Sequence, residues 1–256
     1  MLGKLLKYEI PALGRKLIPL YIAWVATALV VGVMLLGKHD VPEFLTVISG
    51  LIYVAVTTAV VVMTIILIIQ RYARDLLGDG GYFSHTLPVG AGTHIAGKTI
   101  GATLWVLISI LIAVLTGLIT VAITAGWNNI SYSLSSVFGD FDARVLLLII
   151  EFVILATASL AKSILAVYAA ITIGYQARRH KVLYSIIAYI GVLIFESVLA
   201  KALTSLVNID QINITSLDQI GSIQFFFCFG FAVSIAIGAV YFLISRYLMT
   251  RRLNLD

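Results

Sequence analysis

Residues 53–69 have the sequence YVAVTTAVVVMTIILII, in which no side chain is charged. A strand of a membrane barrel would alternate apolar and polar residues, whereas this run is apolar on every face and predicts a helix. A helix needs about 20 apolar residues to cross the roughly 30 Å hydrocarbon core of a bilayer. Extended to residues 45–69, the run is long enough to predict a membrane-spanning helix.

Five more apolar runs of similar length lie on either side of it. Together the six predicted spans cover residues 17–36, 45–69, 100–125, 145–174, 182–207 and 223–247. Hydrophobic residues make up 61% of the chain and charged residues 11%, whereas about a quarter of the residues in soluble domains are charged. We therefore expect an all-α membrane protein with six transmembrane helices, forming a single transmembrane domain over residues 1–256.

The distribution of lysine and arginine predicts the orientation of these spans. With both termini in the cytoplasm, 13 of the 17 basic residues fall in segments on the cytoplasmic side: Lys4, Lys7, Arg15, Lys16, Arg71, Arg74, Lys98, Arg178, Arg179, Lys181, Arg246, Arg251 and Arg252. Short cytoplasmic loops carry such an excess. The net charge of +5 is thus a topology signal, and we expect no nucleic-acid partner.

The first residues of the chain predict an amphipathic helix. Leu2, Leu5, Leu6, Ile10 and Leu13 recur at helical spacing, and lysines lie between them. Such a helix suits the inner surface of a membrane, with its lysines near anionic lipid headgroups. The alternative is a charged entry to the first span.

Enzyme signatures are absent from the sequence. The four histidines show no HExxH spacing for zinc, and all fall in connections or at span ends, away from any buried serine nucleophile. No GxxxxGK[ST] phosphate loop is present, so ATP hydrolysis would need another chain. Cys228, the one cysteine, forms no internal disulfide, and we expect it to be a small buried apolar residue. We predict no catalytic residue, metal or cofactor in this chain.

A polar, glycine-rich segment interrupts the first half of the chain: residues 71–89, RYARDLLGDGGYFSHTLPV. Arg71 and Asp75 are spaced to pair on a helix that continues the second span, and Gly78 is a good residue to end it. Tyr82 and Phe83 are aromatics of the kind that anchor interfaces. The segment predicts a short, turned projection into water, although an ordinary inner loop is the simpler interpretation.

Two stretches resemble the permease subunit of type-2 ABC exporters, in the branch found in Gram-positive bacteria. LLKYEI followed by GRKLIPLY is similar to the basic amphipathic helix that leads into the first span of that family. Residues 71–89 followed by Lys98 are similar to the family's arginine-rich exit from the second span, then Gly-Tyr, Thr-Leu-Pro and a lysine. Where many members have an acidic residue, this chain has Gly80.

The resemblance implies a coupling helix between the second and third spans that contacts a cytoplasmic ABC ATPase. The residues that would make this contact are Arg74, Asp79, Gly80, Gly81, Tyr82, Phe83, His85 and Pro88. The partners implied are the ATPase, which would bind ATP and magnesium, a second permease copy or a related permease, and membrane lipids. The location implied is the bacterial plasma membrane.

Four ionisable residues lie in the predicted spans: Glu151, Lys162, Glu196 and Lys201. Such residues are costly in a bilayer and are functional candidates by default. Counting along the spans places Glu151 and Glu196 at similar depths, with Lys201 as a partner for either one and Lys162 snorkelling toward the inner surface. They form either a polar patch in the translocation path or at the permease pairing surface, or a neutral helix-to-helix contact.

Three classes of function fit the sequence. The first is the membrane subunit of an ATP-driven exporter of a peptide, lipid-like or drug-like substrate. The second is a sensor or assembly subunit of an ATPase-linked complex, and the third is a stand-alone secondary transporter or membrane enzyme. The hydroxyls of Thr57, Thr58, Ser109 and Thr116 suit either a cavity lining or ordinary helix packing.

Overall fold

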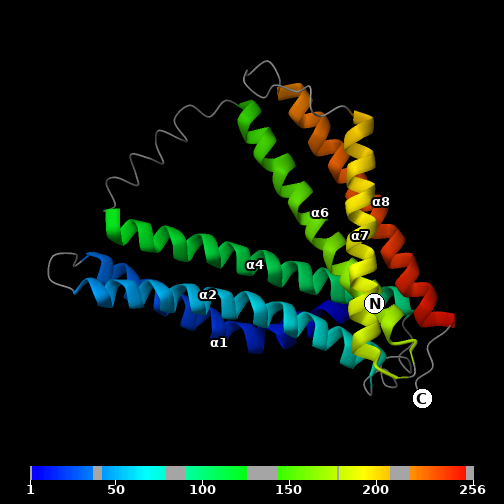
Figure 1. Ribbon diagram of the computed structural model, residues 1–256, viewed down its shortest axis with the longest axis horizontal. Helices are drawn as coiled ribbons and strands as arrows, with labels where there is room; N and C mark the ends of the chain where they lie inside the picture. Colours follow the sequence, from blue (N-terminus) through cyan, green and yellow to red (C-terminus); the bar gives the residue numbers. More distant parts are fainter. Residues whose placement is uncertain are drawn as a thin grey trace. The chain divides into compact units, whose positions relative to one another are not determined.

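The computed structural model describes residues 2–36, 42–78, 90–125, 143–177, 179–207 and 220–251. Within these ranges the chain is helical and contains no strand. The long helices are α1 (Leu2–Leu36), α2 (Glu43–Tyr72), α4 (Ala91–Ala125), α6 (Ala143–Gly174), α7 (Lys181–Val207) and α8 (Ile220–Arg251) (Figure 1). Each of these 6 helices is long and apolar enough to cross a membrane, which confirms the predicted number of spans.

Helix α1 differs from the prediction of a separate surface helix followed by a span. It is continuous from Leu2 to Leu36 and contains both Pro11 and Pro19. A proline inside a helix removes one backbone hydrogen bond, a loss that membrane helices tolerate where their neighbours satisfy the freed groups. Its first turns still have two faces, because Lys4 and Lys7 are exposed while Leu13 is buried. Location of the exposed face at a membrane surface stays a prediction.

Contacts along the chain define two compact units. The first, here called the α1 unit, comprises Gly3–Ile68 and Gly101–Ala143. The second, here called the α6–α8 unit, comprises Met1–Leu2, Ile69–Ile100 and Arg144–Asp256. Helices α2 and α4 therefore contribute one end to each unit.

In the α1 unit, α1 lies beside the parts of α2 and α4 that belong to it (Figure 1). Its core consists of six buried residues: Leu13, Leu17, Tyr21, Trp24, Val60 and Trp105. Gly14 is needed for this packing, because a Cβ there would lie 2.7 Å from the Trp105 ring. Close approach through small residues is the usual means by which helices associate in lipid, where apolar side chains gain little from leaving their surroundings.

Hydroxyl side chains join the three helices of the α1 unit. Trp24 Nε1 donates to Thr57 Oγ1 at 2.9 Å, and Tyr53 donates to Thr116 Oγ1 at 3.2 Å. Tyr21 and Ser109 share a hydrogen bond of 2.6 Å. Aromatic residues with a polar group usually find such a partner when buried. Thr57, Ser109 and Thr116 therefore serve helix packing, which was one of the two predicted roles.

In the α6–α8 unit, α6 and α8 run parallel and approach closely through small residues. Ser159 and Ser234 are hydrogen-bonded at 3.4 Å, with Ser234 buried. One turn away on either side, a Cβ on Gly230 would lie 3.4 Å from Leu155, and one on Gly238 would lie 3.8 Å from Lys162. This spacing of four residues is the small-residue pattern by which membrane helices pack.

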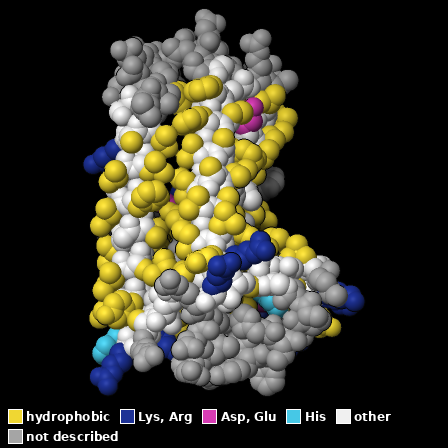
Figure 2. All heavy atoms as spheres, turned by 90° about the vertical axis from the view of Figure 1, so that its right-hand side faces the viewer, with side chains coloured by type: hydrophobic (Ala, Val, Ile, Leu, Met, Phe, Trp, Pro, Cys, Tyr) yellow, Lys and Arg dark blue, Asp and Glu magenta, His cyan; other side chains and the backbone are white. Residues whose placement is uncertain are grey.

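Large apolar side chains cover the exposed faces of the long helices. Figure 2 shows hydrophobic side chains along the helices on the face that it presents. Among them are Phe152 on α6, Phe195 on α7 and Leu243 on α8, each more than half exposed. Such a surface is typical of helices that face lipid. Cys228, predicted to be buried, is exposed on this kind of surface, because α8 turns its small residues toward α6 instead.

Candidate functional site

The end of α2 leads into the glycine-rich segment through an irregular turn. Residues Ala73–Leu77 form the π-helix η1, in which the N–H of Gly78 donates to the carbonyl of Ala73 at 2.8 Å. Arg71 and Asp75 are 3.6 Å apart as an i,i+4 pair, as predicted. The helix ends at Gly78, also as predicted, but in an extended conformation with φ −100°, which does not require glycine. Short π-helical turns are frequent at functional sites.

Asp75 is the centre of a cluster of basic side chains. Lys98 Nζ, on α4, donates to Asp75 Oδ2 at 2.8 Å, and Arg74 Nε lies 3.9 Å from Asp75 Oδ1. The Lys98 side chain is only 6% exposed, so its ammonium depends on Asp75 for much of the solvation it has lost. This ion pair joins η1, which follows α2, to α4 on the two sides of the glycine-rich segment.

Tyr72 anchors the same end of α2 to α6 and α8. Its ring stacks on that of Tyr168 with centroids 3.8 Å apart and an interplanar angle of 7°. The Tyr72 hydroxyl lies 2.9 Å from Thr172 Oγ1 and donates to Met249 Sδ at 3.9 Å. Tyr72 is fully buried, and Leu76 one turn later is equally buried. A displacement of this end of α2 would therefore be passed to α6 and α8 by direct contact.

The first turns of α4 are also buried in the α6–α8 unit. His94, Ile95 and Lys98 are 7% exposed or less. Gly92 faces α8, where the Arg246 Cδ and the Phe242 ring would each lie 3.4 Å from a Cβ placed on it. We call the group formed by Tyr72, Asp75, His94, Ile95 and Lys98 the loop base, since it holds the residues on both sides of segment 79–89.

Most of the predicted coupling residues fall outside the described residues. These are Asp79, Gly80, Gly81, Tyr82, Phe83, His85 and Pro88. Arg74 is described, and its side chain is 76% exposed beside the loop base. Reasoning from the sequence missed two contacts of the loop base, the Asp75–Lys98 pair and the Tyr72–Tyr168 stack. The opposite charges of Asp75 and Lys98, on either side of the glycine-rich segment, were a signal from which their pair could have been predicted.

The intramembrane ionisable residues are paired differently from the prediction. Lys162 Nζ donates to Glu196 Oε2 at 3.0 Å, so Lys162 does not snorkel. The Tyr241 hydroxyl, on α8, donates to the other oxygen of Glu196 at 3.0 Å. Lys201, the predicted partner, is exposed and forms no ion pair with a described residue.

The expected equal depth of Glu151 and Glu196 is also wrong. Glu196 lies opposite Lys162, which is about 16 Å farther along α6 than Glu151. The reason is the antiparallel register of α6 and α7, which their short connection fixes. One carboxylate oxygen of Glu151 is buried and has no hydrogen-bond partner among the residues that the structure describes, so the two glutamates have unlike surroundings.

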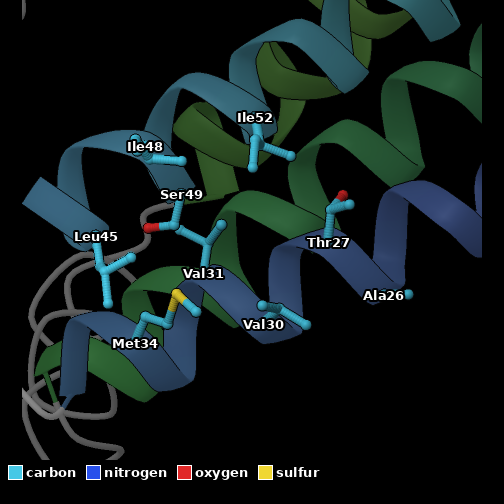
Figure 3. A pocket seen from close by; sticks show the side chains of 9 residues that line it. All are labelled: Ala26, Thr27, Val30, Val31, Met34, Leu45, Ile48, Ser49 and Ile52. Atoms are coloured by element: carbon cyan, nitrogen blue, oxygen red, sulfur yellow. The ribbon is translucent and has the colours of Figure 1, made fainter. Parts of the chain in front are cut away.

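A cavity of about 240 Å³ lies between α1 and α2 within the α1 unit. Figure 3 shows its lining, in which Val31 and Met34 come from α1 while Ile48 and Ser49 come from α2. Its hydroxyls are already used, because Ser49 donates to the Thr46 carbonyl and Thr27 to the Trp24 carbonyl. A cavity with this lining favours apolar occupants, and it offers no group for acid–base or nucleophilic chemistry.

Within the part of the chain that the structure describes, no three histidine, cysteine, aspartate or glutamate side chains gather to hold a metal ion. The candidate site in the described residues is the loop base, which lies on both sides of segment 79–89, and the Lys162–Glu196–Tyr241 cluster is a second polar centre. Comparison of the chain with protein-family models, with curated proteins and with solved structures finds no match.

Proposed function

We propose that this chain is the membrane-spanning subunit of an ATP-driven ABC exporter in the bacterial plasma membrane. It would form the path for a peptide, lipid-like or drug-like substrate, and it would work with a second permease subunit, identical or related. Hydrolysis of ATP would take place on a separate cytoplasmic subunit that binds ATP and magnesium. Segment 79–89 would contact that subunit.

Two features of the chain support this proposal. The six membrane-spanning helices match the number in the family that the chain resembles. Lysine and arginine are enriched in cytoplasmic loops, and Arg71, Arg74 and Lys98 lie around segment 79–89. A segment between two spans on that side is accessible to a soluble ATPase.

The observation that carries the proposal is the Asp75–Lys98 ion pair at the loop base. An ATPase biases a membrane domain only through contacts that differ between its own two states. For such a bias to act, the contacted segment must be mechanically joined to the helices that move. The ion pair joins Asp75, before the segment, to Lys98, after it, at 2.8 Å, and Tyr72 contacts α6 and α8. A push on segment 79–89 would therefore act on Asp75 and Lys98, and through Tyr72 on α6 and α8.

Purification with a candidate ATPase tests the proposal. The full chain is expressed with an ATPase encoded beside it and purified in mild detergent, and we expect the two to co-elute. Tyr82→Ala and Gly80→Pro should abolish co-elution by changing the contact surface. Tyr184→Ala is a matched control, because it removes an exposed tyrosine from α7 near another predicted cytoplasmic connection. Co-elution and full ATP-dependent transport by both segment variants would refute the coupling role.

A further inference from the structure

Helix α7 is attached to its unit along one narrow strip. Over residues 181–205 no side chain is buried, and the partly buried ones recur every three or four residues. They are Lys181, Ser185, Ala188, Val192, Glu196, Leu199 and Leu203. All other side chains in that range are exposed, including large apolar ones such as Ile187 and Phe195. One strip of this width is the seam by which a helix lies against its neighbours.

Contacts along the seam fix the register of α7 against α6. At one end, Gly174 of α6 directly faces Ser185 of α7, so closely that a Cβ on Gly174 would overlap the serine. Farther along, Val192 packs against a cluster that includes Ala166. Lys162 and Glu196 come next, at 3.0 Å. The two helices are therefore antiparallel and tightly joined at the end where the chain turns.

That turn is itself compact. The N–H of Tyr175 donates to the Ile171 carbonyl at 3.0 Å, and the N–H of Ala177 donates to the Gly174 carbonyl at 3.1 Å. The Lys181 ammonium lies 5.5 Å from the centre of the Tyr175 ring. The first residues of α7 are thus held beside the end of α6 by the close approach of the Gly174 and Ser185 backbones and by the Lys181–Tyr175 contact.

The opposite part of the seam depends on Glu196. Among the described residues, the side-chain hydrogen bonds that join α7 to other helices are those of this carboxylate. One oxygen accepts from Lys162 of α6 and the other from Tyr241 of α8, so a single side chain links three helices. Beyond it the seam consists of Leu199 and Leu203. Apolar contacts of that kind hold helices weakly in lipid, because lipid tails are as apolar as leucine.

We infer that α7 is a lever pinned at the Gly174–Ser185 contact and that Lys162, Glu196 and Tyr241 form the latch that holds it against α6 and α8. With the latch closed, both charges are paired and α7 lies along its seam. Loss of the Lys162 ammonium or of the Glu196 charge removes the strongest contact between α7 and the other helices. The part of α7 beyond Glu196 then tilts away, while the pinned end stays in place.

The inference does not depend on the proposed exporter function, since the latch and the lever lie within the α6–α8 unit. It also offers a role for the charged side chains of Lys162 and Glu196 within the predicted spans. A buried ion pair adds little to static stability compared with apolar residues of the same shape. Unlike an apolar contact, an ion pair is an attachment that opens when either charge is lost.

Distances between spin labels test the lever directly. The full chain carries Cys228→Ser, and two label pairs are introduced at exposed positions of α6 and α7. One pair, Val153→Cys with Ala202→Cys, reports on the part beyond Glu196. The matched control pair, Ile173→Cys with Ile186→Cys, reports on the pinned end. Distances are measured by electron paramagnetic resonance in lipid nanodiscs.

Glu196→Gln and Lys162→Met open the latch with little change of shape. For both we expect the Val153–Ala202 distance to lengthen by about 5 Å, or a second population to appear there. A tilt of about 10° produces that shift at the end of a lever roughly 27 Å long. The Ile173–Ile186 distance should stay unchanged. The charge-swapped chain, Lys162→Glu with Glu196→Lys, should restore the original distance.

Three outcomes would overturn the inference. The first is an unchanged Val153–Ala202 distance in the folded single variants. The second is an equal change in both label pairs, which would indicate general loosening of the unit. The third is a charge-swapped chain as open as the single variants. If neither single variant can be purified, the charge-swapped chain and Tyr241→Phe still test the inference. It requires the original Val153–Ala202 distance in the charge-swapped chain and a partly lengthened distance in Tyr241→Phe.

Discussion

The ammonium of Lys98 lies 2.8 Å from the carboxylate of Asp75, and the two residues stand on either side of the glycine-rich segment 79–89. The side chain of Lys98 is almost completely buried, whereas that of Asp75 is 30% exposed and also lies near Arg71 and Arg74. Removing Asp75 would therefore leave a desolvated cation among two further cations. Removing Lys98 would leave Asp75 with both arginines.

We expect Asp75→Asn to destabilise the protein more than Lys98→Met. Removal of one partner of a buried ion pair costs about 3 kcal/mol, and the partial exposure of Asp75 reduces this figure. The double variant should be more stable than Asp75→Asn alone, because it no longer contains the buried ammonium that has lost Asp75. Thermal unfolding monitored by size-exclusion chromatography measures all three. Equal losses for the two single variants, added together in the double, would contradict a direct pair.

Tyr72 offers a graded test of the loop base. Tyr72→Phe keeps the stack on Tyr168 and removes the hydroxyl that faces Thr172, so a loss of about 1 kcal/mol is expected. Tyr72→Ala removes a fully buried ring, and losses of about 3–5 kcal/mol are usual for such changes. Tyr247→Ala, at an exposed tyrosine of α8, is the control and should change the unfolding temperature little. Similar losses at both tyrosines would argue against the anchor.

Filling the cavity between α1 and α2 should stabilise the α1 unit. Ser49 is 5% exposed, lines the cavity and donates its hydroxyl only to the Thr46 carbonyl of its own helix. In Ser49→Val the added methyl group enters the cavity without breaking a contact between helices, so a gain of about 1 kcal/mol is expected. Ser205→Val, on an exposed face of α7, is the matched control. A lower unfolding temperature for Ser49→Val would mean that the cavity cannot accept a side chain.

Orientation of the spans can be tested with cysteines in a Cys228→Ser background. Ser84→Cys lies in the segment predicted to face the cytoplasm, and Ser133→Cys lies in a connection predicted to face outward. In intact cells, a membrane-impermeant maleimide should label position 133 and leave position 84 unlabelled until the membrane is permeabilised. The opposite result would invert the topology and remove the basis for a cytoplasmic partner at segment 79–89.

Hydropathy was sufficient to predict the long helices, because a span must be apolar over about 20 residues whatever its neighbours are. It could not predict α1 as one continuous helix, since Pro11 and Pro19 lie where a break was equally reasonable. Hydropathy also could not predict the contact of Asp75 with Lys98 on α4, for another reason. A pairing across the glycine-rich segment depends on how the chain folds back, whereas Arg71 and Arg74 were close to Asp75 by local geometry.

The wrong partner for Glu196 has an instructive cause. Depths were counted from the apolar ends of each span, and these ends shift when a helix tilts or extends beyond the bilayer. Counting from the short connection between α6 and α7 would have been better, because the Gly174–Ser185 contact fixes their register there. From that contact, Lys162 and Glu196 are nearly the same number of residues away along their two helices. The pairing of Lys162 with Glu196 could therefore be predicted from the sequence only with the knowledge that the turn between α6 and α7 is tight.

Gly174 limits which residues position 174 can accept. Along most of α7 we expect one bulky aliphatic residue to replace another, since most of its side chains are exposed among the described residues. At position 174 even alanine would collide with the backbone of Ser185. The hydrogen atom that Gly174 carries in place of a methyl group therefore decides whether α6 and α7 can meet at this point.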